Sequence, residues 1–313
     1  MSLVVNNNLM AANTARTLNQ HYGRLQTSTQ RLSSGMRINS AADDAAGLAI
    51  RELQRADIAA LQQGARNAND AISMIQTADG ALGVIDEKLI RLKELAEQAA
   101  TGTYDSTQRL MIESEYQAMA SEITRIANAT DFNGIKLLDG SLSGAHKGDG
   151  ASAGPNGDGK KADGSVDLNS TGKMKIHFGT GNDSAEDYYY VTIGDCTASA
   201  LGVGNQAGID SDGYTVSTQE AAQKALVGIN NAIVSKDKIR AHLGAMQNRL
   251  ENTITNLNVQ AENLQAAESR ISDVDVATEM TQFVRNQILT QSAVAMLGQA
   301  NSLPQMAMQL IGG

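Results

Sequence analysis

The sequence lacks the residues from which disulfide frameworks, thiolate metal sites and aromatic cores are built. Its 313 residues include no Trp, three Phe and one Cys, Cys196. A single Cys excludes an internal disulfide and a cage of thiolate ligands, and we predict that Cys196 is a small apolar core residue in a strand. Ala, Leu, Ile and Met supply most of the apolar side chains instead, which favours helices and close helix packing.

An excess of positive charge and a long apolar run are missing too. The formal net charge is −9 and the 25 Lys and Arg residues form no basic stripe, which argues against nucleic acid as a partner. No stretch approaches the ~18 apolar residues of a membrane span, so we expect no membrane partner. The first residues, MSLVVNNNLM, lack the basic and long apolar regions of a cleaved secretory signal. If the protein leaves the cell, we expect another export route.

Signatures of catalysis and of metal binding are absent as well. The four His residues are scattered, and the sequence contains no H-E-x-x-H, G-x-S-x-G, P-loop or dinucleotide motif. The Asp- and Gly-rich run 148–164 lacks the spacing and the closing Glu of a calcium loop. We therefore expect neither enzymatic activity nor a cofactor.

What the sequence does contain is helical periodicity. From Ile58 to Ala99 apolar residues recur at intervals of three and four, and two further segments, 112–126 and 218–271, show the same spacing. These segments predict a bundle of long antiparallel helices formed by 45–138 and 215–271. The middle of the chain, 139–214, is rich in Gly, Ser and Asp and contains two β-type runs, KMKIHFG and YYYVTIG. We expect it to be an inserted loop with a β-hairpin.

Both ends of the chain carry apolar residues at intervals of seven. The heptad positions are Leu18, Leu25 and Leu32 at the N-terminus and Leu289, Met296, Leu303 and Leu310 at the C-terminus. We predict that 1–44 and 272–313 pair as a terminal coiled coil, so the fold class is mainly α, with a small β-hairpin region inserted between the two helical halves.

An energy comparison indicates that this terminal pair is incomplete alone. Ordering the backbone costs on the order of 1–2 kcal/mol per residue, whereas about eight side chains on one seam each return about 2 kcal/mol. We therefore expect neighbouring copies to cover the terminal apolar residues, which makes them a self-assembly surface that is disordered in the monomer. An ordinary intramolecular coiled coil is the alternative that periodicity leaves open.

Between the first two helices lies a connector whose sequence is RLSSGMRINSAADDAAGLAI, residues 31–50. This stretch resembles a signature of bacterial flagellins. The resemblance extends, in the same order along the chain, to ARNANDAISMIQTADGALG, TDFNGIKLLDG, ESRISDVDVATEM and QILTQSAVAMLGQANSLPQ. It covers about the first 140 and the last 95 residues.

The resemblance implies a subunit of the flagellar filament, secreted unfolded through type III export and located outside the cell. Its terminal helices would form the inner tube of a helical homopolymer. Arg31, Asp43 and Asp44 would lie where subunits meet. The implied partners are other copies of the chain, a flagellar export chaperone, and the filament cap and junction proteins.

A host partner is implied as well, because flagellins are sensed by a Toll-like receptor. The stretch LIRLKELAEQ matches the recognised region and places Arg91, Glu94 and Leu95 there, with Glu115 on the next helix. The alternative is that Leu95 belongs to the core and that the charged residues form a solvated face.

Two other classes of protein have similar patterns. A hook-filament junction protein shares such ends and is the alternative function. A chemoreceptor-type signalling hairpin would need a membrane span, which the sequence lacks.

Overall fold

The computed structural model describes residues 8–143, 172–183, 186–204 and 215–311, apart from the side chains of 303–305 and 307–311. The run 148–164 lies outside these residues. The chain forms two compact units, which we name the terminal unit, Met1–Ala59 with Ala261–Gly313, and the bundle unit, Ala60–Gln260. This division falls inside two long helices, whereas the boundaries predicted from sequence, 44/45 and 271/272, follow the breaks between helices.

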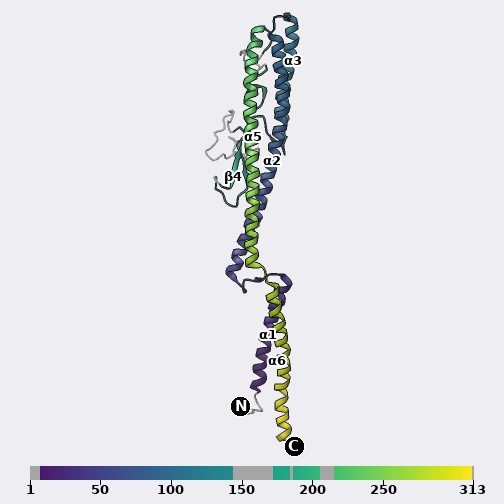
Figure 1. The fold of residues 1–313 in the computed structure, drawn as a ribbon, viewed down its shortest axis with the longest axis vertical. Coiled ribbons are helices and arrows are strands. Elements are labelled where there is room, and N and C mark those ends of the chain that lie inside the picture. The colour runs from purple at the N-terminus through teal and green to yellow at the C-terminus, as the bar shows by residue number, and fades with distance from the viewer. Residues whose placement is uncertain (1–7, 144–171, 184–185, 205–214, 312–313) are drawn as a thin grey trace, which may run out of the picture. The chain divides into compact units, whose positions relative to one another are not determined.

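Three helices build the bundle, as predicted: α2 (Ala45–Ala100), α3 (Ser106–Ala129) and α5 (Gln219–Ser272). Within the bundle unit α2 and α5 run antiparallel, and α3 returns beside α2 (Figure 1). Most of the predicted seam of α2 is buried, and Leu82, Ile85, Leu89 and Leu92 are completely so. Helix α2 ends where the sequence turns, and Arg109 of α3 stabilises that end by donating to the Ala99 carbonyl at 3.1 Å.

A charged pair that the sequence pattern did not reveal joins α5 to α2. The Lys236 side chain is almost completely buried, and its Nζ donates to Asp86 Oδ1 at 2.6 Å and approaches Asp237 Oδ1 at 2.8 Å. One turn further on, Arg240 Nε donates to Asp79 Oδ1 at 2.7 Å. Because Lys236 and Arg240 of α5 each bond a specific aspartate of α2, these contacts fix the register of α5 along α2.

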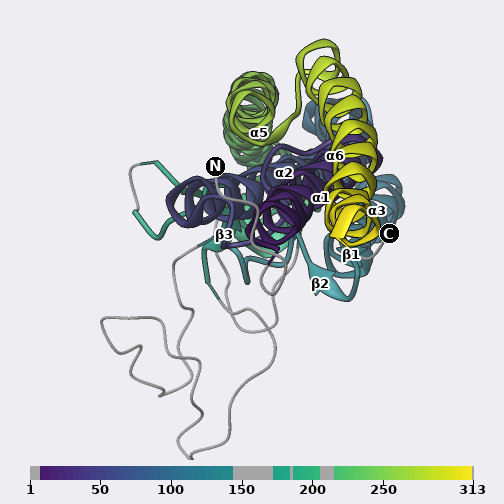
Figure 2. The ribbon, with the colours of Figure 1, turned by 90° about the horizontal axis from the view of Figure 1, so that it is seen from below.

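Two short hairpins and a helical turn accompany the bundle. Strands β1 (Asp131–Phe132) and β2 (Ile135–Lys136) pair around a turn in which Asn133 and Gly134 have positive φ angles, the backbone that Asn-Gly turns favour. The predicted hairpin is confirmed as β3 (Met174–His177) paired antiparallel with β4 (Tyr188–Val191). Figure 2 shows β1, β2 and β3 at the edge of the helices. The short helix α4 spans Ala198–Leu201.

Cys196 is buried, as predicted, but it lies in the irregular segment between β4 and α4. Its predicted location in a strand was wrong, because pairing between β3 and β4 stops at Val191. Burial raises the pKa of the Cys196 thiol to about 12. The thiol is therefore protonated at neutral pH and behaves as an apolar core side chain.

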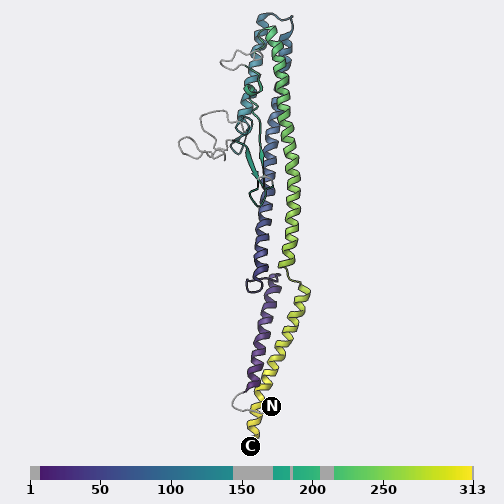
Figure 3. The same cartoon turned by 90° about the vertical axis from the view of Figure 1, so that its left-hand side faces the viewer.

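The terminal unit contains the paired ends of the chain, α1 (Leu9–Ser34) and α6 (Val276–Ile311). These two helices lie side by side, as Figures 1 and 3 show. The Asn8 side chain fixes the start of α1, because its Oδ1 accepts from Ala11 N at 3.0 Å and its Nδ2 donates to the Ala300 carbonyl of α6 at 2.8 Å. The predicted pairing of the two ends is confirmed.

Candidate assembly surface

Among the described side chains of α6, those buried within the terminal unit are small or polar. They are spaced by seven and comprise Glu279, Asn286, Ala293 and Ala300. On α1 the predicted heptad residues Leu18, Leu25 and Leu32 are half-buried. Among the α6 side chains that the structure describes, the well-covered ones are two alanines and two polar residues, so the pair is held by a thin seam.

The larger residues of the predicted C-terminal heptad lie outside this seam. Leu289 is 37% exposed and Met296 is 61% exposed. Leu303 and Leu310 belong to α6, but their side chains are outside the described residues. Since Ala293 and Ala300 take the covered positions instead, Leu289 and Met296 remain available to another molecule.

Other apolar side chains of the terminal helices are exposed as well. On α6 they include Val276, Met280, Val284, Ile288, Val294 and Met306, and on α1 they include Leu9, Met10 and Tyr22. Together with Leu289 and Met296, these residues define what we call the α1–α6 apolar surface. So many exposed apolar side chains on one helix pair are typical of a surface that associates with another molecule.

The connector between α1 and α2 is organised by its own polar groups. Gly35 ends α1 in the left-handed conformation, with φ 72°, which glycine adopts without strain. Asp43 accepts hydrogen bonds from Ser40 N at 3.0 Å, from Ser40 Oγ at 3.1 Å and from Asn39 N at 3.2 Å. These bonds, from Ser40 above all, hold the pKa of Asp43 below its ordinary value.

The other two predicted connector residues have local partners too. Asp44 Oδ1 accepts from Gly47 N at 2.9 Å and so caps the first turn of α2. Arg31 lies 3.8 Å from carboxylate oxygens of both Asp43 and Glu279. The structure therefore brings Arg31 and Asp43 together, while Asp44 stabilises a helix end.

Sequence reasoning missed a clamp between the two places where the chain passes from one helix to the next. Met36 and Asp273 form an antiparallel bridge, with Arg37 N donating to the Ser272 carbonyl at 2.7 Å and Val274 N to the Gly35 carbonyl at 3.0 Å. The Arg37 side chain adds a third bond, from its Nη2 to the Ile271 carbonyl at 2.8 Å. No periodic signal in either segment indicates this clamp.

The predicted receptor-recognition residues fall into two groups. Arg91 approaches Glu94 at 2.9 Å and Glu115 of α3 at 2.7 Å, and all three side chains are exposed. These carboxylates raise the pKa of Arg91, chiefly through its hydrogen bond to Glu115. Leu95 is only 1% exposed, so it belongs to the core beneath this ion-paired cluster.

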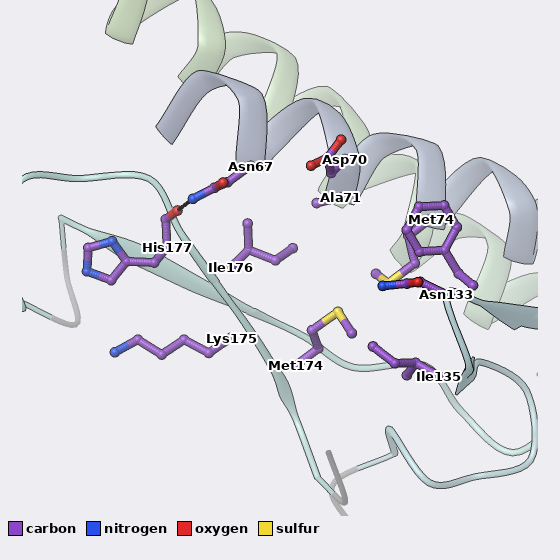
Figure 4. Close-up of a pocket in the computed structure, with 11 residues that line it drawn as sticks. Asn67, Asp70, Ala71, Met74, Asn133, Ile135, Met174, Lys175, Ile176 and His177 are labelled. Carbon is purple, nitrogen blue, oxygen red and sulfur yellow. Dashed lines mark hydrogen bonds between the residues drawn. The ribbon is translucent and has the colours of Figure 1, made fainter. Parts of the chain in front are cut away.

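A pocket of about 340 Å³ lies in the bundle unit between α2 and the two hairpins (Figure 4). Met74, Ile135 and Met174 line its apolar part. Its polar rim is engaged locally, since Asn67 Nδ2 donates to the His177 carbonyl at 2.9 Å and Lys175 lies over the Tyr188 ring at 3.6 Å. These polar groups therefore serve contacts within the bundle unit.

Two negative findings hold for the part of the chain that the structure describes. No group of three or more His, Cys, Asp and Glu side chains there has the arrangement of a metal site. No described helix has an apolar run long enough to cross a bilayer.

Comparison with known proteins adds independent information. Residues 5–143 match the model of the bacterial flagellin N-terminal helical region, and residues 226–311 match that of the C-terminal helical region. The chain is 40% identical to flagellin FlaB2 of Treponema pallidum (strain Nichols), over 99% of this chain and 100% of that protein. It is also 40% identical to a flagellin of Bacillus subtilis (strain 168), over 98% and 99% of the two chains.

Among solved structures, a putative flagellar hook-associated protein from Vibrio parahaemolyticus is similar at a TM-score of 0.51. The two chains are 14% identical over 74% of this chain and 100% of the other. At that level of identity the likeness concerns the fold alone.

Proposed function

This chain belongs to the bacterial flagellins, the structural subunits of the flagellar filament, and from that premise we propose that it polymerises through the α1–α6 apolar surface. Its role in the flagellum is structural and not enzymatic. The observation that carries the proposal is the exposure of Leu289 and Met296, because large apolar side chains that the helix pair leaves uncovered are available to a neighbour.

The proposal can be tested with Met296→Asp. A charge at this exposed position has little effect on the free subunit, but it would be buried in a filament at a large cost. We expect the variant to remain helical by circular dichroism and to form no filaments by electron microscopy after sulfate is added, a salt that strengthens apolar burial. Leu25→Asp would disturb the α1 side of the same pair.

Val227→Asp is the matched control, since Val227 is 62% exposed and lies on α5 of the bundle unit. We expect filaments from the control. Filaments of normal yield from Met296→Asp would contradict the proposal.

The finer roles of the connector and the termini are part of the same proposal. Arg31 and Asp43, which lie 3.8 Å apart at their closest oxygen and nitrogen, would set the register between subunits, while Asp44 holds the start of α2 in place. Export without a cleaved signal, an extracellular location and contacts with an export chaperone, cap and junction proteins would follow from the filament role. Immunogold labelling along the whole filament would support this, and labelling confined to its base would favour the junction alternative.

We also propose recognition by the host Toll-like receptor at the cluster of Arg91, Glu94 and Glu115. Support comes from their exposure on one surface of α2 and α3, with Leu95 acting from below as a positioning residue. We expect Arg91→Ala to lower signalling in receptor reporter cells. The control is Arg125→Ala, which removes an exposed arginine paired with Glu122 on α3. Equal signalling by both variants would contradict the proposal.

A further inference from the structure

The terminal helix pair differs in charge from the rest of the chain. Helices α1 and α6 together contain Arg16, Arg24, Arg31 and Arg285 but only one acidic residue, Glu279, and α1 contains none. The whole chain has a net charge of −9. A basic helix pair therefore belongs to a chain whose remaining residues are strongly acidic.

Three of these arginines line one cleft. Arg24 and Arg31 of α1 and Arg285 of α6 surround a space of about 510 Å³, with Glu279 and Leu289 also in its wall. Within the described part of the chain, Arg24 and Arg285 have neither a hydrogen bond nor an ion pair, and both are exposed. The cleft consequently presents guanidinium groups that the subunit itself does not neutralise.

Glu279 offsets only part of this charge. Its carboxylate is 3.8 Å from Arg31 Nη1 at the closest, which is too long for a hydrogen bond, and its other oxygen is buried without a partner among the described residues. Asp43 and Glu279 both lie 3.8 Å from Arg31 and offset that arginine alone. Arg24 and Arg285 therefore leave the cleft with a positive charge, and this charge suits a carboxylate.

We propose that the cleft binds carboxylate side chains of a second copy of this chain, which would place neighbouring subunits in register. This inference rests on the proposed polymerisation. The same chain offers the complementary groups, since Asp57, Glu262 and Glu268 of the terminal unit have no hydrogen-bond or ion-pair partner in the described residues. Pairing them with Arg24 and Arg285 would neutralise both groups in every copy of a repeating polymer.

Continuity with the α1–α6 apolar surface identifies the occupant as another subunit. Leu289 lines the cleft and also belongs to that surface, so a neighbour that covers the apolar residues reaches the arginines as well. Charged groups beside an apolar contact set the association rate and the register more than the affinity.

The first experiment measures seeded polymerisation by light scattering at low salt, about 50 mM NaCl, where charge attraction is weakly screened. We expect the double variant R24E/R285E to elongate about tenfold more slowly than the unmodified chain. The slowing should shrink at about 500 mM NaCl. The control is Arg16→Glu, which also reverses a charge on α1 but lies outside the cleft, and we expect near-normal elongation from it.

A charge swap identifies the partner groups. We expect D57K/E262K/E268K to slow elongation as R24E/R285E does, and the chain that carries all five substitutions to regain most of the rate. Circular dichroism would test whether each variant is folded. We expect R24E/R285E to fold, because both arginines are exposed.

Normal elongation by folded R24E/R285E would overturn the inference. So would a five-substitution chain as slow as its two parents, because the arginines would then bind some other group. Failure of the unmodified chain to polymerise would overturn the proposed polymerisation itself. The two results are distinct, because the first concerns the variants and the second the unmodified chain.

Discussion

The bundle unit and the terminal unit have similar heptad patterns, but they cover their own apolar residues to different extents. In the bundle, the seam of α2 buries Leu82, Ile85, Leu89 and Leu92 completely. In the terminal unit, α6 buries alanines and leaves Leu289 and Met296 exposed. A heptad pattern therefore shows that a helix has an apolar side. Whether those side chains are buried within the same chain shows whether the helix that covers them belongs to that chain or to another.

The sharpest way to test this contrast is to truncate one leucine in each unit. Leu89→Ala removes a fully buried side chain, so we expect the free energy of unfolding of the bundle to fall by about 2–5 kcal/mol. Leu289→Ala should change the stability of the monomer by less than about 0.5 kcal/mol. Urea unfolding monitored by circular dichroism measures both, and equal losses would remove the distinction between the units.

A second prediction concerns the buried charge in the bundle. Burial lowers the pKa of Lys236, but hydrogen bonds to Asp237 and Asp86 outweigh this and hold it above the ordinary value. Lys236→Ala leaves two carboxylates without their cation. We expect it to lower the free energy of unfolding, measured in urea, by about 1–3 kcal/mol. Lys224→Ala, at an exposed ion pair with Glu220 on the same helix, should cost less than about 0.5 kcal/mol.

Removing the cap that Asp44 provides should lower stability by less than removing Leu89 or Lys236. Asp44→Ala removes the acceptor for Gly47 N, and we expect a local loss of about 1 kcal/mol. Amide hydrogen exchange at residues 45–48 should accelerate about fivefold. Unchanged exchange there would show that Asp44 is not a cap.

The smallest effect should be a pH dependence at Asp43. Its pKa lies below the ordinary 3.8, mainly because Ser40 N donates to the ionised carboxylate. The contribution of ionised Asp43 to stability is therefore complete above the pKa that Asp43 has in the unfolded chain. It is lost as the pH falls through the pKa of Asp43 in the folded chain. Exchange of the Ser40 amide, corrected for its intrinsic pH dependence, should rise below about pH 4. In Asp43→Asn this transition should be missing, and a persisting transition would assign it to another group.

The sequence predicted the helices well because their periodicity is long and continuous. The bundle helices and the β3–β4 hairpin were recognised from spacing and residue type, and the pairing of α1 with α6 from the matching heptads. The burial of Cys196 was also expected, although its location in a strand was not correct.

The details of the terminal unit were less accessible from sequence. Periodicity assigns apolar residues to one side of a helix, but Ala293 and Leu289 are close enough in angle that only packing decides which is covered. The clamp between Met36 and Asp273 and the ion pair of Lys236 with Asp86 join residues distant in sequence. Neither pair has a local signature. The assembly, connector and receptor roles of individual residues stay predictions.

The measurement that tests the central claim most directly is hydrogen exchange by mass spectrometry on the free subunit and on filaments of the same chain. We predict that amides of residues 276–302 exchange rapidly in the free subunit and are strongly protected in the filament, while residues 78–96 are protected in both states. Equal protection of residues 276–302 in the two states would contradict the claim that neighbouring copies complete the terminal helix pair.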